Sequence, residues 1–180
     1  MTNTRNIDLE DKLREEILRG GHKSFWQRFA EEHHKDDEAI AILFDFIISG
    51  KDKLAQTTSE IIRYISDMNP TIVIPFIDRL VEKLNTDCHD AVKRCIFRMF
   101  QRTTFTEDQA GFVVDTAFKH LQDRSNAIAI RVFAMTTLYN LAQTYPELYP
   151  ELDACITENL SEESTGFQNR AVKILNRTWK

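Results

Sequence analysis

The sequence predicts an all-α fold in which about four helix pairs stack into a right-handed superhelix (solenoid). Apolar residues recur with helical spacing along nearly the whole chain of 180 residues, and no stretch shows the alternation of a half-buried strand. Glycine (5) and proline (4) are too scarce for the tight turns of an all-β fold. One helix opening, Ala followed by Val or Ile and then Lys or Arg, recurs at residues 91–93, 129–131 and 171–173.

The N-terminal 35 residues predict two helices. Residues 8–19 place leucine and isoleucine along one stripe, and the Gly-Gly pair that follows is a typical helix end. Residues 22–34 form the second helix, whose aromatic residues are expected to face the core: Phe25, Trp26 and Phe29. We interpret residues 1–35 as an N-terminal helical cap or extension and residues 36–180 as the repeat array, within a single domain overall.

The array divides into four pairs, each with a first (A) and a second (B) helix. The expected starts of the A helices are Asp37, Pro70, Thr106 and Pro146. The expected starts of the B helices are Lys51, Asp87, Ser125 and Thr165. Successive starts lie about 33–40 residues apart, and a fixed period of this size indicates a helical repeat protein.

Local signals support these helices in turn. Three acids at residues 36–38 open the first A helix and Gly50 ends it, as the helix dipole and C-terminal capping favour. Pro70 suits the first position of the second A helix; a strand over residues 71–77 is the alternative, but Pro75 and the periodic residues that follow favour a helix.

The third and fourth pairs have equally clear signals. Thr106 and Gln109 have capping-box spacing. The helix over residues 125–145 holds a single charge, Arg131, so we expect it to pack between neighbours. Its expected core residues are Val132, Phe133 and Leu138. Pro146 and Pro150 open the last A helix, as Pro70 and Pro75 open the second.

The repeated motifs resemble those of HEAT or armadillo-type repeats over about residues 36–180. The B helices contain "AVKRCIF", "AIRVFAM" and "AVKILN", similar to the Val-Arg step of that family, and "YPELYPEL" resembles its A-helix opening. The resemblance implies that A helices line a convex face and B helices a concave one, which binds another protein.

Charge divides between the two helix types. The A helices sum to about −13 and the B helices to about +7, although the net charge of the chain is −5. By the resemblance, the concave face is therefore mildly basic and suits an acidic partner. The candidate binding residues are Lys93, Arg94, Arg98, Arg131, Lys173 and Arg177. The structural alternative is that Arg131 pairs with an acid on a neighbouring repeat and that Arg94 pairs with Asp90 at i,i+4.

Motifs of known chemistry are missing from the sequence. It contains no Gly-rich phosphate loop, no Gly-x-Ser-x-Gly elbow and no His-Glu-x-x-His. Cys88 and His89 are adjacent and point apart on a helix, so we expect no metal site. We expect no catalytic residue and no cofactor, and we expect His22 and His120 at the surface.

These observations predict a non-enzymatic scaffold that is monomeric and binds a protein partner along its B helices. Three cysteines without close pairing and the lack of an apolar leader at the N-terminus predict a cytoplasmic protein with free thiols. No apolar run is long enough to span a membrane. The alternative is nucleic-acid binding, as in DNA alkylation-repair glycosylases built from similar helix pairs, although the acidic net charge opposes it.

Overall fold

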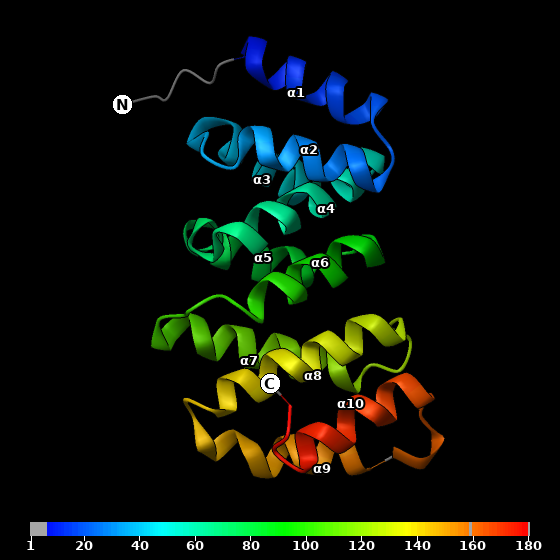
Figure 1. Cartoon of the computed structure of the whole chain (residues 1–180). Coiled ribbons are helices and arrows are strands. Elements are labelled where there is room, and N and C mark those ends of the chain that lie inside the picture. The colour runs from blue at the N-terminus through cyan, green and yellow to red at the C-terminus, as the bar shows by residue number, and fades with distance from the viewer. Residues whose placement is uncertain (1–6, 159, 180) are drawn as a thin grey trace. The chain divides into compact units, whose positions relative to one another are not determined.

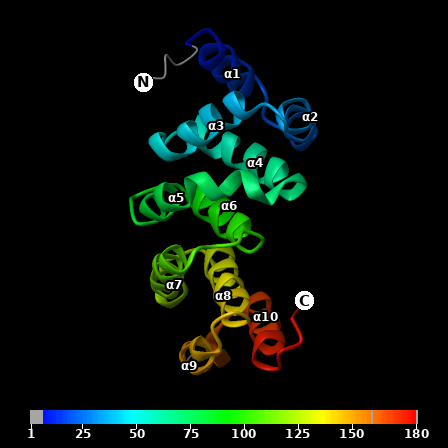
Figure 2. The same ribbon diagram turned by 90° about the vertical axis from the view of Figure 1, so that its left-hand side faces the viewer.

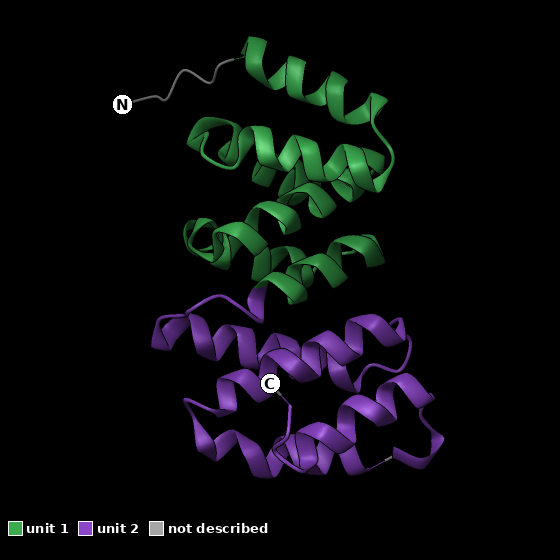
Figure 3. Ribbon diagram, in the orientation of Figure 1, with its two compact units in different colours: residues 1–99 green, residues 100–180 purple. Residues whose placement is uncertain are grey.

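The computed structural model describes residues 7–158 and 160–179, and these residues form ten α-helices and three short 3₁₀ helices without any strand (Figure 1). The predicted all-α class is therefore confirmed. The chain divides into two compact units, residues 1–99 and residues 100–180 (Figure 3).

Unit 1 is centred on one B helix. Its elements are α1 (Ile7–Arg19), α2 (Lys23–His33), α3 (Asp37–Ser49), α4 (Lys53–Met68), η1 (Pro70–Phe76), α5 (Ile77–Leu84) and α6 (Asp90–Phe100), which ends at the unit boundary. Helix α4 packs against α1, α2, α3 and η1. Within this unit α3 and α5 form one layer, and α4 and α6 form the other (Figure 2).

Packing requires glycine at only the first position of the Gly-Gly pair after α1. A Cβ on Gly20 would lie 2.2 Å from the ring of Phe25, which is buried in the core, whereas a Cβ on Gly21 would meet nothing within 4 Å. Glycine at position 20 therefore lets the chain pass close to the first core aromatic of α2. Of the predicted stripe, Phe25 and Phe29 are buried and Trp26 is half-buried.

Proline splits two of the predicted A helices. The second A helix is a 3₁₀ helix over Pro70–Phe76 that continues as α5, and the fourth is η2 (Pro146–Leu148) followed by α9 (Tyr149–Thr157). A proline lacks the amide hydrogen of an α-helical bond, and its ring clashes with the preceding turn, so Pro75 and Pro150 prevent one continuous α-helix from the first proline.

Unit 2 contains the last two pairs. Its elements are α7 (Glu107–Gln122), α8 (Ile128–Ala142), η2, α9, η3 (Leu160–Glu162) and α10 (Thr165–Leu175). The capping box of Thr106 and Gln109 is confirmed, with both reciprocal bonds formed. Helix α8 packs against α7, η2, α9 and α10, as its apolar character predicts.

One part of the predicted α8 core is wrong. Leu138 is fully buried, but Val132 and Phe133 are only half-buried. A helix with one charge in 15 residues has apolar side chains on every face, so its sequence does not reveal which face is left partly uncovered.

The repeat period reappears in the polar contacts between successive pairs. Hydrogen bonds that join residues 32 to 39 positions apart include Lys83 Nζ to Gly50 O, Arg94 to Glu60, Asn140 Nδ2 to Gln101 O, Arg131 to Glu163 and Arg170 to Thr136. The predicted spacing of 33–40 residues between helix starts is thus close to the sequence distance across one repeat contact.

Candidate functional site

In unit 1 a chain of charges runs along the contact between α4 and α6. Glu60 accepts hydrogen bonds from Arg94 Nη2 at 2.6 Å and from Arg63 Nε at 3.1 Å. Arg63 Nη1 also donates to Asp67 at 3.2 Å, and Arg98 Nη2 lies 3.9 Å from the same carboxylate. Three arginines therefore share two acids, so this cluster has one positive charge in excess.

The centre of this cluster is desolvated. Burial by itself raises the pKa of Glu60, but hydrogen bonds from Arg63 and Arg94 outweigh it and hold that pKa below its ordinary value. The adjacent Cys95 thiol donates to Glu60 Oε1 at 3.4 Å, and its burial is the main cause that raises the pKa of the thiol to about 12. Glu60 and Cys95 are therefore structural, whereas the outer arginines are accessible to a partner.

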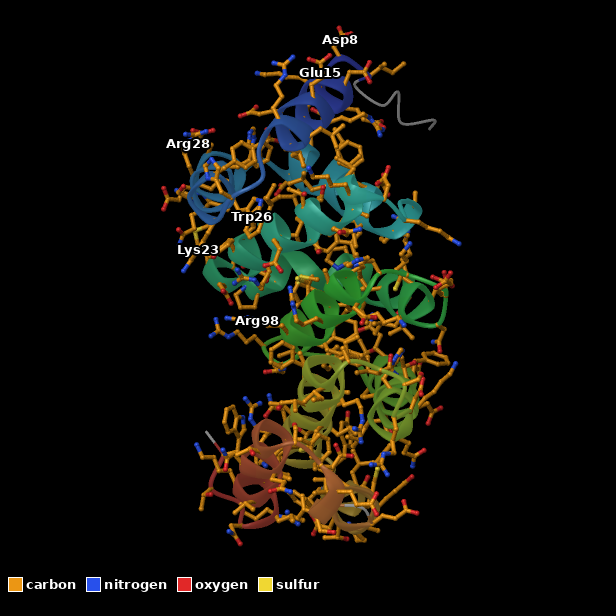
Figure 4. The ribbon with its side chains drawn as sticks, turned by 90° about the vertical axis from the view of Figure 1, so that its right-hand side faces the viewer. Asp8, Glu15, Lys23, Trp26, Arg28 and Arg98 are labelled. Carbon is orange, nitrogen blue, oxygen red and sulfur yellow. The ribbon has the colours of Figure 1, made fainter. Side chains whose placement is uncertain are left out.

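Further cations lie on the same side of unit 1. Lys23, Trp26 and Arg28 from α2 and Arg98 from α6 project along one side of the unit (Figure 4). The Arg98 side chain is 44% exposed, and Lys23 is exposed with no ion-pair partner in the described part of the chain. We call Lys23, Arg28, Arg94 and Arg98 the cationic face of unit 1.

Lys93 lies next to this face. Its side chain is half-buried, near the Cys88 thiol, and the described residues give it no ion-pair partner. The predicted intrahelical pair between Asp90 and Arg94 is replaced by the pair between Arg94 and Glu60. A partly desolvated carboxylate on a neighbouring helix attracts a guanidinium more strongly than an exposed carboxylate on its own helix.

In unit 2 the cation that recurs in the B-helix opening has an internal role at Arg131. Arg131 and Glu163 have side chains 8% and 6% exposed and form two bonds of 2.6 and 2.9 Å. Arg131 Nε also donates to Leu121 O at 2.9 Å, and the guanidinium lies over the ring of Phe167. The predicted pairing of Arg131 with an acid on a neighbouring repeat is therefore confirmed.

Arg177 is also engaged within unit 2. It makes two bonds to Asp153 of α9, of 2.7 and 3.0 Å, and its guanidinium stacks 4.0 Å from the centre of the Tyr149 ring. Its φ of 57° places it in the left-handed region, where the chain turns back after α10. These contacts tie Arg177 to α9, an A helix, and explain how a non-glycine residue holds this conformation.

The turn after α10 brings Trp179 over another cation. The amides of Thr178 and Trp179 both donate to Lys173 O, which closes the helix end. The Arg170 guanidinium then lies 3.5 Å from the centre of the Trp179 ring, and Lys173 Nζ lies 5.8 Å from it. Arg170 also donates to Thr136 Oγ1 of α8.

A neutral groove of about 290 Å³ lies elsewhere in unit 2. Its walls combine aromatic rings with hydroxyl and amide groups: Phe100, Gln101, Thr103, Thr104, Phe105, Thr137, Asn140, Leu141, Thr144 and Tyr145. It contains no charged side chain.

Metal ligands do not gather in residues 7–158 and 160–179, where no group of three His, Cys, Asp or Glu side chains is placed to hold an ion. His89 instead accepts from the Ala91 amide at the start of α6. His22 is exposed as predicted, but the prediction for His120 is wrong, because it is buried. In the same described ranges, none of the helices is both long and apolar enough to cross a membrane.

Comparison with known families identifies the repeats. A family model described as a HEAT repeat domain matches residues 10–178. The chain belongs to the HEAT repeat domain family. Neither the curated proteins nor the solved structures gave a match. The HEAT match begins within α1 and includes α2, and the division into a cap of residues 1–35 and an array of residues 36–180 stays a prediction.

The HEAT repeats thus give the six predicted cations different surroundings. Arg98 and Lys173 are exposed, Arg94 is partly exposed beside Glu60, and Lys93 is half-buried. Arg131 is buried and Arg177 is exposed, and each forms a bidentate pair with a carboxylate of unit 2. Arg170 is not in the predicted set, although its position three residues before Lys173 places both side chains on one face of the same helix.

Proposed function

We propose that this HEAT repeat protein is a non-enzymatic scaffold that binds an acidic segment of another protein along its B helices and, in unit 1, along the adjoining side of α2. The observation that supports this most is the cationic face of unit 1, where two acids are shared by three arginines and Arg98 has only a long contact of 3.9 Å to Asp67. An acidic partner can form an ion pair with Arg98 there without breaking a short ion pair that Arg98 makes within the chain.

The A helices of the same unit support the direction of this proposal. Helix α3 begins with Asp37 and Glu38 and holds no basic residue. Helices α4 and α5 each hold two basic and two acidic residues, and α6 holds three basic residues and one acid, so the excess positive charge of the two layers lies on α6. Like charges repel, and an acidic partner is therefore steered away from α3 and towards the cationic face. Free cysteines at positions 88, 95 and 155 are in line with a cytoplasmic location.

The test is affinity capture with charge reversals on and off this face. The face variant is Lys23→Glu with Arg98→Glu, and the matched control is Lys12→Glu with Arg19→Glu on α1, where both side chains are also exposed. The captures are treated with nuclease and compared by quantitative mass spectrometry, and circular dichroism verifies that each variant is folded.

The proposal expects a protein that is captured by the wild type and by the control and is depleted at least about tenfold by the face variant, the effect of about 1.4 kcal/mol of lost binding. The association rate of the purified pair should fall as salt rises. Equal capture by both variants refutes the proposal, and loss of all binding after nuclease treatment favours nucleic-acid binding instead.

A further inference from the structure

Arg170 is a partly desolvated cation without a counter-ion among the described residues. Arg124, Arg131 and Arg177 of the same unit each pair with a carboxylate, but no acid of the described chain lies within ion-pair distance of Arg170. Helices α8 and α10 contain no Asp or Glu at all. Burial lowers the pKa of Arg170, as expected for a guanidinium that has lost water and gained no anion.

The contacts of Arg170 fix its orientation but use few of its donors. The stack on Trp179 occupies one face of the planar guanidinium, and Nη1 donates to Thr136 Oγ1. That hydroxyl is itself fixed, because it donates to Val132 O at 2.8 Å. A guanidinium has five N–H donors in its plane, and stacking leaves this edge available for a planar anion.

We propose that Arg170, held by Trp179 and assisted by Lys173, binds a carboxylate side chain of the acidic partner segment. The inference rests on the proposed function and names an anchoring site for it on the B helices of unit 2. The planar edge of Arg170 matches a carboxylate through two parallel hydrogen bonds. Because the stack on Trp179 already restricts the Arg170 side chain, less conformational entropy is lost when the carboxylate binds.

The surroundings favour a carboxylate over a phosphate group. Phosphate sites commonly use free main-chain amides at a helix N-terminus, but the nearby amides of Thr178 and Trp179 already donate to Lys173 O. Lys173 lies in the last turn of α10, where the negative end of the helix dipole opposes a doubly charged anion more than a singly charged one.

The test is a titration of the full chain with a synthetic hexaglutamate peptide, followed by NMR of the Arg170 Nε–H and Trp179 indole N–H resonances. Both resonances should shift in a saturable manner, whereas hexaglutamine and inorganic phosphate at the same concentration should shift neither. A silent Arg170 at saturating hexaglutamate overturns the inference, and so does phosphate that displaces the peptide.

Three variants measure the contribution of each group. Arg170→Gln should weaken hexaglutamate binding about tenfold (about 1.4 kcal/mol), and Arg170→Lys should weaken it as well, because the planar fork is lost while the charge stays. Trp179→Leu should weaken it about threefold. The control Arg124→Gln removes an exposed, paired cation and should bind as the wild type does. Wild-type affinity in Arg170→Lys, or tighter binding in Trp179→Leu, contradicts the proposed geometry.

The outcome also separates this inference from the proposed function. If Arg170 is silent while the Lys23→Glu and Arg98→Glu variant still loses its partner, only the anchoring site is wrong. If Arg170 binds the peptide and that variant captures the partner normally, the proposed cationic face of unit 1 is wrong and the site in unit 2 stands.

Discussion

Replacing Arg131 by alanine should destabilise unit 2 far more than an ordinary surface change. The replacement removes both bonds to Glu163 and the bond to Leu121 O, and it leaves a carboxylate whose side chain is only 6% exposed. Breaking a buried ion pair by removing one partner costs about 3–5 kcal/mol, because the remaining charge is uncompensated.

The chain contains a matched control for this measurement. Arg124 and Glu162 form a similar pair one residue away from Glu163, at 3.0 Å, but their side chains are 50% and 63% exposed. Solvent screens such a pair, so Arg124→Ala should cost at most about 1 kcal/mol. The double variant Arg131→Met with Glu163→Leu should recover most of the loss, since replacing both partners leaves no buried charge.

The free energy of unfolding is measured by urea melts with circular dichroism. A second melt uses Trp179 fluorescence in a Trp26→Phe background, which reports on unit 2, because these are the two tryptophans of the chain. If Arg131→Ala shifts the midpoint no more than Arg124→Ala does, the pair is not an internal support of unit 2. If the double variant is as unstable as Arg131→Ala, the loss arises from packing and not from the charge left behind.

Three further predictions concern the rest of the chain. Gly20→Ala should cost about 1–3 kcal/mol in a urea melt because its Cβ enters the space of a core ring, while Gly21→Ala should be nearly silent. The lowered pKa of Glu60 adds stability that is fully present above its unfolded pKa of about 4.3 and is lost as the pH falls through the lower folded pKa. Glu60→Gln should therefore reduce the dependence of the unfolding free energy on pH in this acidic range. An unchanged pH dependence would show that the pKa of Glu60 does not differ between the folded and unfolded states. At pH 8 a thiol reagent should label the half-buried Cys155 well before Cys95, whose pKa is about 12, and the reverse order would contradict the burial of Cys95.

The helix pairs could be predicted from the sequence because their signals are local. Acids, Pro70 and the capping box of Thr106 mark helix starts through bonds within a single turn. The break after Pro70 was not predicted, because Pro70 and Pro75 were interpreted together as the opening of one helix. The 3₁₀ helix of seven residues found there depends on how the segment packs on α4.

The candidate site was less predictable because it depends on which distant groups meet. Lys93, Arg131 and Lys173 occupy the same place in the motif, yet they are half-buried, buried and exposed. The difference arises outside the motif: Glu163, in the loop before α10, attracts Arg131 inward. Asp153 and Tyr149 contact Arg177 across 24 and 28 positions, distances that the repeat period does not suggest.

The spacing of the polar contacts has a consequence for how quickly the chain folds. Hydrogen bonds between successive pairs in the described part of the chain join nearby segments; for example, Asn140 and Gln101 are 39 positions apart and Lys83 and Gly50 are 33 positions apart. Closing a short loop costs less chain entropy than joining distant segments, and proteins with mostly local contacts fold in about microseconds to milliseconds. Each helix pair can therefore form against its neighbour before the remainder of the chain is available, as during synthesis on the ribosome.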